Sequence, residues 1–346
     1  MKPALIRALE GEMLDRIPFW YMRQAGRYLP EYNELRRGRT FIEVMESADL
    51  SVEISLQPYR RFKMDGVIMF SDILTPVRGA GIPLHFEEKK GPVLEKTVQS
   101  ESDIDMFRAF QAEKACPYVK EILTRLRAHL ASEEDRPALL GFAGSPFTLA
   151  SYLIEGGGTQ KFEKTKECIF RRTELFNSLC DALTDLTIQY LRMQIDAGAE
   201  AVQIFDSWGG ILSTAHYKEF SAPYTARIIS ALRADGKAPV ILFVGNGSHL
   251  VPLMAEQKPD ALSLDWRISA DQVRREIPDG IAIQGNLDPL VLYGTAERTG
   301  NETRKVLAAF GNRKGYVFNL GHGIHPATPI ENVQAMIESI RSFKRS

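Results

Sequence analysis

The chain has 346 residues, of which 44% are hydrophobic, 25% charged and 9% aromatic. This is the composition of an ordinary globular protein, and it excludes disordered and fibrous chains. Lysine and arginine together number 43 against 44 acidic residues, so the net charge of -1 provides no overall field to attract nucleic acid or an acidic membrane, and any anionic partner must be bound locally.

Short apolar runs bounded by turn residues predict buried parallel strands, and eight such runs occur along the chain. In chain order they cover residues 17–22, 66–70, 137–142, 201–205, 239–244, 261–265, 281–286 and 316–320. The amphipathic stretches between them predict helices over residues 41–62, 103–133, 173–198 and 331–346.

Strands that alternate with helices form a parallel sheet, and eight such units close a (β/α)8 TIM barrel. An open doubly wound sheet is the alternative, but residues 22–28 (MRQAGRY), after the first strand, lack its glycine fingerprint. A barrel needs about 250 residues, so the remainder must form insertions. Residues 75–98, rich in glycine and proline, predict a hairpin insertion after the second strand. Since no linker or repeat is found, we predict an α/β fold with a single domain over residues 1–346.

The three cysteines, Cys116, Cys168 and Cys180, have spacings that fit neither a disulfide framework nor a Cys-x2-Cys zinc site. The N-terminal residues lack the apolar run of a signal peptide, and no stretch of about 18 apolar residues occurs. We therefore expect a soluble, cytoplasmic protein that binds neither membranes nor nucleic acid.

Barrel enzymes carry their chemistry on the loops that follow the carboxyl ends of the strands. Polar or turn residues follow every predicted strand. In chain order they are Arg23, Gln24 and Arg27, then Ser71 and Asp72, Gly144, Ser145 and Pro146, Asp206 and Ser207, Gly245 and Asn246, Asp265, Asn286 and Asp288, and finally Asn319 and His322.

The strongest local signal is the segment 16–39, which holds six arginines against two acidic residues. Guanidinium groups pair bidentately with carboxylate or phosphate, so this segment predicts a site for a polyanionic ligand. Its last three arginines, Arg36, Arg37 and Arg39, fit surface ion pairs equally well. Arg23 and Arg27 are the stronger candidates because they lie directly at the end of a strand.

Asp72 follows the second strand and is expected to point into the barrel mouth, where a carboxylate needs a cationic or N–H-rich partner. It either acts on a ligand or has a structural role, as a helix cap or an ion-pair partner of an arginine. Asp206 and Asp265 are interpreted as caps or loop anchors. His322 and His325 lie in a glycine-rich loop without a metal-ligand pattern, and no metal is predicted.

Two segments, PFWYMRQAGRYLPEY (residues 18–32) and GFAGSPFTLASYLIEGGG (residues 141–158), resemble the signature motifs of the uroporphyrinogen decarboxylase family. Four further strand ends are similar to that family in the same order: residues 70–76, 204–210, 284–289 and 319–326. The resemblance implies a cytoplasmic homodimeric (β/α)8 barrel, a carboxy-lyase of haem biosynthesis. It would remove CO2 from the four acetate side chains of uroporphyrinogen III and give coproporphyrinogen III, without a metal or organic cofactor.

Matched residue by residue, the resemblance implies a set of substrate contacts in which Asp72, Arg23 and Arg27 are also catalytic. Arg36 is a looser candidate. The implied contacts are Arg23, Gln24, Ala25, Gly26, Arg27, Asp72, Tyr152, Ser207 and His322.

Loss of CO2 from an acetate needs an electron sink, and protonation of the attached pyrrole at a ring carbon creates one in the substrate itself. The protein must then supply an anion near the pyrrole nitrogens, a role that we assign to Asp72. Arg23 and Arg27 orient carboxylates, and one of them, or a water that it holds, is a candidate proton donor. Tyr152, Ser207 and His322 bind further carboxylates by hydrogen bonds, with His322 also a candidate for positive charge.

Two alternatives remain at this point. A methyltransferase of the same superfamily would bind zinc through His and Cys, but the three cysteines lie in predicted helices, away from the strand ends. A non-catalytic tetrapyrrole carrier would use the same arginines, and the presence of Asp72 disfavours it.

Overall fold

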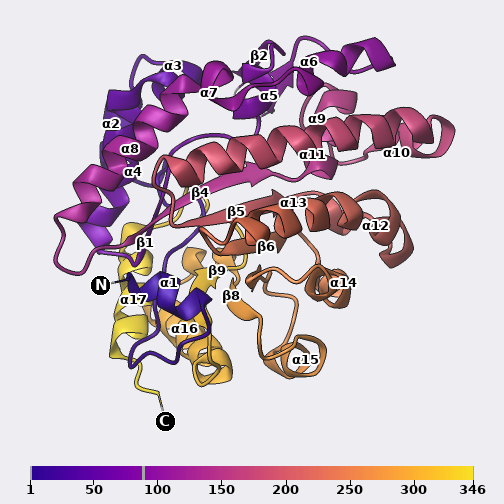
Figure 1. The fold of residues 1–346 in the computed structure, drawn as a ribbon. Coiled ribbons are helices and arrows are strands. Elements are labelled where there is room, and N and C mark those ends of the chain that lie inside the picture. Colours follow the sequence, from indigo (N-terminus) through magenta and orange to yellow (C-terminus); the bar gives the residue numbers. More distant parts are fainter. Residues whose placement is uncertain (1, 88–89, 346) are drawn as a thin grey trace.

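A computed structural model describes residues 2–87 and 90–345. At its centre lies a curled parallel sheet of seven strands in the order β1-β4-β5-β6-β7-β8-β9, with helices against its outer face (Figure 1). Its strands are β1 (Gly66–Ile68), β4 (Ala138–Gly144), β5 (Ala201–Asp206), β6 (Val240–Val244), β7 (Ala261–Ser263), β8 (Ala282–Leu287) and β9 (Tyr316–Leu320). Seven of the eight predicted strands are thus confirmed. They are almost wholly buried, as expected for apolar runs covered on both faces.

The predicted first strand, residues 17–22, is wrong in detail, because this segment forms only an isolated bridge between Phe19 and Phe318 of β9. It lies between the two edge strands of the sheet. On one side the Phe19 carbonyl accepts a hydrogen bond from the Asp65 N–H, directly before β1, and on the other the Trp20 N–H donates to the Phe318 carbonyl. The segment therefore occupies the eighth position of a barrel without becoming a regular strand.

Side chains replace part of the backbone ladder along this segment. Pro18 has no N–H to donate. The Met22 N–H donates to the side-chain oxygen of Asn319 (3.2 Å), and the Gln24 amide donates to the Gly66 carbonyl (3.1 Å). An apolar pattern in the sequence cannot reveal such bonds, which is why it predicted a regular strand here.

The helices follow the predicted stretches, but two of these stretches are divided. Residues 103–133 form α6, α7 and α8 rather than one helix. The predicted helix over residues 41–62 is two helices, because Ser47 ends the first and its side chain accepts a hydrogen bond from the Leu50 N–H, which caps the second.

Among the described residues, none of the helices combines the length and the apolarity needed to cross a membrane. The α-helices are α1 (Ala4–Leu9), α2 (Pro30–Arg36), α3 (Phe41–Glu46), α4 (Ala48–Phe62), α5 (Thr75–Gly79), α6 (Asp105–Arg108), α7 (Ala112–Ala115), α8 (Pro117–Ala131), α9 (Pro146–Glu155), α10 (Glu163–Arg171), α11 (Thr173–Asp196), α12 (Thr214–Phe220), α13 (Ala222–Asp235), α14 (Val251–Glu256), α15 (Ala270–Glu276), α16 (Ala296–Phe310) and α17 (Ile330–Ser342). Short 3-10 helices are η1 (Glu101–Asp103), η2 (Gly209–Ile211), η3 (Ser248–Leu250) and η4 (Pro289–Tyr293).

The segment predicted as a hairpin insertion, residues 75–98, begins with helix α5 rather than with a strand. Its later part contains β2 (Leu84–Glu87) and β3 (Gly91–Leu94), which pair antiparallel as a separate small sheet. Residues 88–89, which would form the turn, lie outside the described residues, as does residue 346 of the last predicted helix. The hairpin itself therefore stays a prediction.

Helix α1 closes the amino end of the barrel. Its buried Leu5 and Leu9 pack in one cluster with Trp20, Leu140 and Val317, and the helix contacts β4, β8 and β9. A larger cluster fills the space between the outside of the sheet and the surrounding helices. Because α1 covers the amino end, the carboxyl ends of the strands remain as the mouth of the barrel.

A chain of fully buried polar side chains crosses the barrel interior. Trp20 Nε1 donates to Gln284 Oε1 (2.8 Å), and Gln284 Nε2 donates to Gln203 Oε1 and Ser263 Oγ (both 2.9 Å). The Gln203 amide in turn contacts the sulfur of Met22 (3.4 Å). Because buried amides are costly to leave unpaired, this chain fixes the N-terminal segment against three strands.

Candidate active site

The structure brings the predicted site residues to the mouth of the barrel. Residues 23–27 form the loop between the extended segment and α2, and Asp72 lies between β1 and α5. Tyr152 is on α9, which follows β4, while Ser207 comes directly after β5 and His322 after β9. Five separate loops or helices thus contribute residues to the site. Four of them follow the carboxyl end of a strand, and residues 23–27 follow the segment that takes the place of the first strand.

Asp72 combines an anchored oxygen with a free one. Its Oδ1 accepts a hydrogen bond from the Leu74 N–H (2.8 Å), directly before α5. Its Oδ2 accepts no hydrogen bond from any residue that the structure describes. Burial raises the pKa of the Asp72 carboxyl above its ordinary value, against the opposing effects of the Leu74 N–H and the positive charge of Arg23. A purely structural role for Asp72, as a helix cap, therefore explains the position of only one of its two carboxylate oxygens.

Arg23 and Arg27 are exposed, and their guanidinium groups form no hydrogen bond or ion pair with residues 2–87 or 90–345. The charge of Arg23 reaches its neighbours, since it opposes the rise in the pKa of Asp72 and of Tyr152 and lowers that of His322. The described residues thus leave two guanidinium groups of this loop available to a ligand, and that of Arg23 acts on the carboxylate of Asp72.

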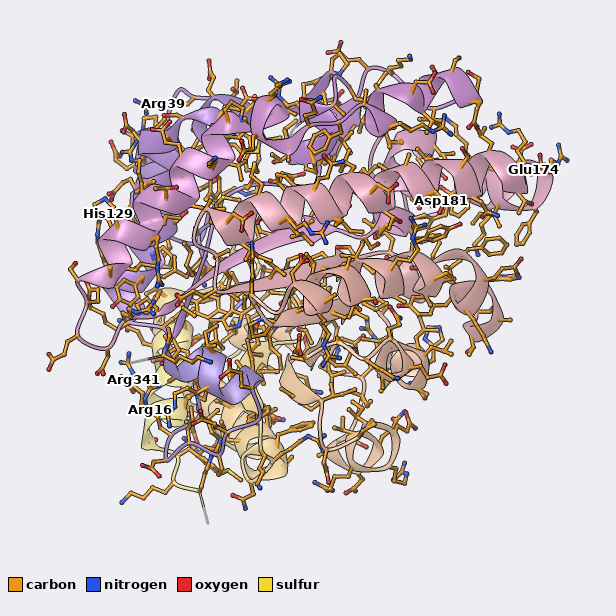
Figure 2. All side chains as sticks on the ribbon, viewed as in Figure 1. Arg16, Arg39, His129, Glu174, Asp181 and Arg341 are labelled. Carbon is orange, nitrogen blue, oxygen red and sulfur yellow. The ribbon has the colours of Figure 1, made fainter. Side chains whose placement is uncertain are left out.

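The other arginines of the segment 16–39 are dispersed, as Figure 2 shows for Arg16 and Arg39. Arg16 makes a bidentate ion pair with Asp65 at the amino end of the sheet. Arg37 pairs with Glu34 (2.7 Å), and Arg36 donates to the Arg39 carbonyl (3.1 Å). These arginines thus form ion pairs or hydrogen bonds with the protein itself. Of the segment predicted to bind a polyanion, only Arg23 and Arg27 remain as candidates.

The loop of residues 23–27 is held rigidly but leaves its own N–H groups available. Arg23 has a left-handed backbone with a φ of +60°, a strained conformation for any residue other than glycine. On its two sides, the Met22 carbonyl accepts from the Ile324 N–H (3.0 Å), and the Tyr28 hydroxyl donates to the Gln24 carbonyl (2.6 Å). Within the described part of the chain, the N–H groups of residues 23–27 have no acceptor, so they too are available to an anion.

The side chain of Gln24 is fully buried. Its amide nitrogen donates to the Gly66 carbonyl (3.1 Å), and its amide oxygen accepts from the Ile68 N–H (3.4 Å). The predicted substrate contact of Gln24 is therefore left to its main chain, in line with the free N–H groups of this loop. Ala25 and Gly26, both partly exposed, offer their main chain in the same way.

Trp208 is a residue that the sequence analysis missed. Its ring stacks on that of Tyr152, with centroids 3.9 Å apart and planes at 26°. The stack fixes the orientation of the Tyr152 phenol, whose pKa is raised by burial and by the charge of Asp72, so that it stays a neutral O–H donor. Its position directly after Ser207, at a strand end, could have indicated a role in the site. In a sequence, however, a tryptophan at such a position is just as easily interpreted as a residue of the hydrophobic core.

Asp206 anchors the neighbouring loops and is fully buried. Its Oδ1 accepts from Ser145 Oγ (2.7 Å) and Thr148 Oγ1 (2.8 Å), and its Oδ2 accepts from Ser221 Oγ (2.7 Å). The interpretation of Asp206 as an anchor is confirmed. Asp265 is likewise engaged, by the Ser248 hydroxyl and the Arg267 N–H.

The surroundings of His322 favour its neutral form, unlike the positive charge for which it was a candidate. Burial, followed by the charge of Arg23, lowers its pKa to about 4. Its Nδ1 accepts a hydrogen bond from the Gly323 N–H (2.8 Å), which leaves the ring proton on Nε2. His322 can therefore donate one hydrogen bond to a ligand through Nε2–H.

We expect an NMR titration of the imidazole signals to show His322 with a midpoint near 4, assigned by the signal lost in His322→Asn. Because the folded pKa lies below that of the unfolded chain, the stability contributed by neutral His322 should be lost as the pH falls from about 6.5 toward that midpoint. The His322→Asn variant should lose less stability than the wild type over this interval. A midpoint near 6.5 for His322 would contradict the assignment.

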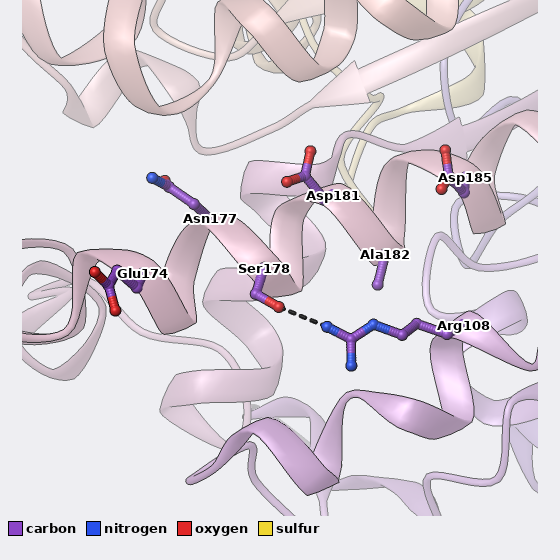
Figure 3. A pocket seen from close by; sticks show the side chains of 7 residues that line it. All are labelled: Arg108, Glu174, Asn177, Ser178, Asp181, Ala182 and Asp185. Carbon is purple, nitrogen blue, oxygen red and sulfur yellow. Dashed lines mark hydrogen bonds between the residues drawn. The ribbon is translucent and has the colours of Figure 1, made fainter.

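Two cavities on the outer surface are separate from these residues. One of about 530 Å³ lies between α6 and α11 (Figure 3). Several of its polar groups pair with each other or with nearby side chains, as Arg108 does with Ser178 (2.7 Å) and Glu101. It is lined by Arg108, Glu174, Asn177, Ser178, Asp181, Ala182 and Asp185.

The described residues contain no group of three or more His, Cys, Asp or Glu side chains placed to hold a metal ion. All three cysteines are buried thiols. Cys168 and Cys180 lie within α10 and α11, and Cys116 directly precedes α8. The prediction that all three lie within helices is therefore confirmed for Cys168 and Cys180, whereas Cys116 lies at the start of a helix.

Comparisons with known proteins give two levels of similarity. The family model described as uroporphyrinogen decarboxylase matches residues 1–343. Uroporphyrinogen decarboxylase of Alkalilimnicola ehrlichii is 44% identical over 98% of this chain and 93% of its own, and that of Serratia proteamaculans is 42% identical over 97% and 96%. Among solved structures, a methyltransferase from Methanosarcina mazei superposes with a TM-score of 0.77 over 98% of this chain and 97% of its own, at 20% identity, which concerns the fold alone.

Proposed function

The chain belongs to the uroporphyrinogen decarboxylase family, and from this premise we propose how the residues at its barrel mouth perform the reaction. The enzyme is a carboxy-lyase that converts the acetate side chains of uroporphyrinogen III to methyl groups, giving coproporphyrinogen III. The observation that carries the proposal is the free oxygen of Asp72 beside the charge of Arg23, whose guanidinium group, like that of Arg27 in the same loop, has no partner among the described residues.

The substrate supplies the electron sink. A proton added to the pyrrole carbon next to the ring nitrogen leaves a positive charge on that nitrogen. The bond between the acetate methylene and its carboxylate can then break, so that CO2 leaves and the electron pair neutralises the ring as an exocyclic methylene. Protonation of this methylene gives the methyl group, and loss of the proton first added restores the pyrrole. These reaction steps need no cofactor, because the substrate itself accepts the electron pair.

Asp72 stabilises the cationic intermediate. Its free Oδ2 accepts a hydrogen bond from a pyrrole N–H, and the bond strengthens as the nitrogen becomes positive. The hydrogen bond from Leu74 to Oδ1 holds the carboxylate in place. Because Asp72 is partly buried, its charge is little screened by water, and the interaction is stronger than at an exposed site.

The surrounding groups seat the substrate's carboxylates. Arg23 and Arg27 bind them by forked ion pairs, and the free N–H groups of residues 23–27 add neutral donors. Tyr152, Ser207 and His322 donate single hydrogen bonds, each from a group without charge. One of the arginines, or a water that it holds, delivers the protons.

The direct test is turnover of uroporphyrinogen, kept reduced under anaerobic conditions, with coproporphyrinogen measured after oxidation to the porphyrin. Release of CO2 in step with methyl formation supports the proposal. Tight binding of uroporphyrinogen without turnover would favour a carrier. Transfer of a methyl group from a thiol or corrinoid donor would favour the methyltransferase alternative.

Replacing either Arg23 or Arg27 with lysine should lower kcat/KM by about tenfold to a hundredfold, because lysine keeps the charge but loses the planar fork. Stability should change little, since both guanidinium groups are exposed and unpaired. Arg37→Lys is the matched control, because Arg37 is exposed but paired with Glu34. Wild-type kinetics in both lysine variants would remove these arginines from the site.

The proposal also includes a cytoplasmic homodimer. Large exposed hydrophobic side chains, which include Phe170 (57% exposed), Leu290 (49%) and Tyr293 (47%), are available to a subunit contact. Sedimentation equilibrium of the purified chain tests the dimer. A single monomeric species at micromolar concentration would contradict it.

A further inference from the structure

The aliphatic part of the Arg23 side chain lies directly against Gly323, in the loop after β9. A Cβ atom added to Gly323 would fall 2.4 Å from Cδ, 2.7 Å from Cγ and 2.9 Å from Nε of Arg23. These are the three nearest heavy atoms to such a Cβ. Because non-bonded carbon atoms rest at about 3.5–4.0 Å, a side chain at position 323 and the present path of Arg23 exclude each other.

The backbone of Gly323 does not itself require glycine. Its φ is not among the positive values found in the described chain, so alanine can adopt the same conformation. Its N–H donates to His322 Nδ1, a bond that alanine would also make. The three nearest atoms that would conflict with a side chain here all belong to Arg23.

The backbone of Arg23 has little freedom to move aside. Its left-handed backbone is fixed by the hydrogen bonds of Met22 and Gln24 on its two sides. The atoms in conflict are in the middle of the side chain, so displacing them swings the guanidinium group at its end. A change at position 323 is thus transmitted to the charged group.

We propose that Gly323 is a positioning residue, whose missing side chain forms the slot that aims the Arg23 guanidinium at a substrate carboxylate. The inference rests on the proposed function, in which Arg23 binds the substrate. It explains why two loops far apart in the sequence, residues 23–27 and 321–324, must fit together at the mouth.

The first test is Gly323→Ala, assayed with uroporphyrinogen. We expect kcat/KM to fall at least about tenfold, the loss of one charge-assisted hydrogen bond, with most of the change in KM. Melting temperature should stay within a few degrees of the wild type. Gly280→Ala is the matched control, because an added Cβ there meets no atom within 4 Å. Unchanged kinetics in Gly323→Ala would overturn the inference.

The second test separates positioning from a general disturbance of the site. In an Arg23→Ala background, adding Gly323→Ala should cost no further activity, because the group it displaces is already gone. A further loss as large as in the wild-type background would show that Gly323 acts independently of Arg23, and would overturn the inference. If Arg23→Ala alone leaves kcat/KM unchanged, the failure is in the proposed role of Arg23 itself.

Discussion

Replacing Asp72 with asparagine should lower turnover by at least about two orders of magnitude. Asparagine keeps the shape of the side chain and the acceptor for the Leu74 N–H, so the turn before α5 is preserved. It loses the negative charge, which matters most when the pyrrole nitrogen becomes cationic. The effect should therefore fall on kcat rather than on KM.

Steady-state kinetics and a pH profile check this prediction. Because burial raises the pKa of Asp72, activity of the wild type should fall on the acid side as Asp72 takes up a proton, and this limb should be absent from the asparagine variant. Asp288→Asn is the matched control, since Asp288 accepts from Leu290 N–H (2.9 Å) at another strand end in the same way. Turnover of Asp72→Asn within a few-fold of the wild type would remove Asp72 from the mechanism.

Asp206→Ala should destabilise the fold by about 3 kcal/mol or more, because each buried donor left without its acceptor costs about 1–3 kcal/mol. The hydroxyl groups of Ser145, Thr148 and Ser221 would all lose their acceptor. The midpoint of urea unfolding measures the loss. Asp235→Ala is the control, since Asp235 forms an exposed ion pair with Arg192 and should cost less than about 1 kcal/mol. Equal midpoints for the two variants would show that Asp206 is not an anchor.

The sequence was sufficient to predict most of the fold because buried parallel strands need continuous apolar runs. It failed at residues 17–22, where Pro18 and two side-chain acceptors, those of Asp65 and Asn319, interrupt the ladder. It also joined α3 and α4 into one helix, since the apolar pattern continues through Ser47 and only the cap separates the two. In both places, a polar side chain bonded to the backbone decided the structure.

The candidate site was predictable where residues lie directly at strand ends, as Asp72, Ser207 and His322 do. The rest depended on contacts between distant parts of the chain. Gln24 is a polar loop residue in the sequence, yet its amide is buried against β1. The charge state of His322 follows from its burial and from Arg23, neither of which a single sequence displays.

The bond between the Met22 N–H and the Asn319 side chain joins residues 297 positions apart, and it helps to fix the backbone next to Arg23. Contacts of such long sequence separation form late, because both partners must first be present and then brought together. During synthesis, the loop of residues 23–27 leaves the ribosome long before β9. A nascent chain therefore cannot hold these arginines in place for a tetrapyrrole until β9 has been synthesised.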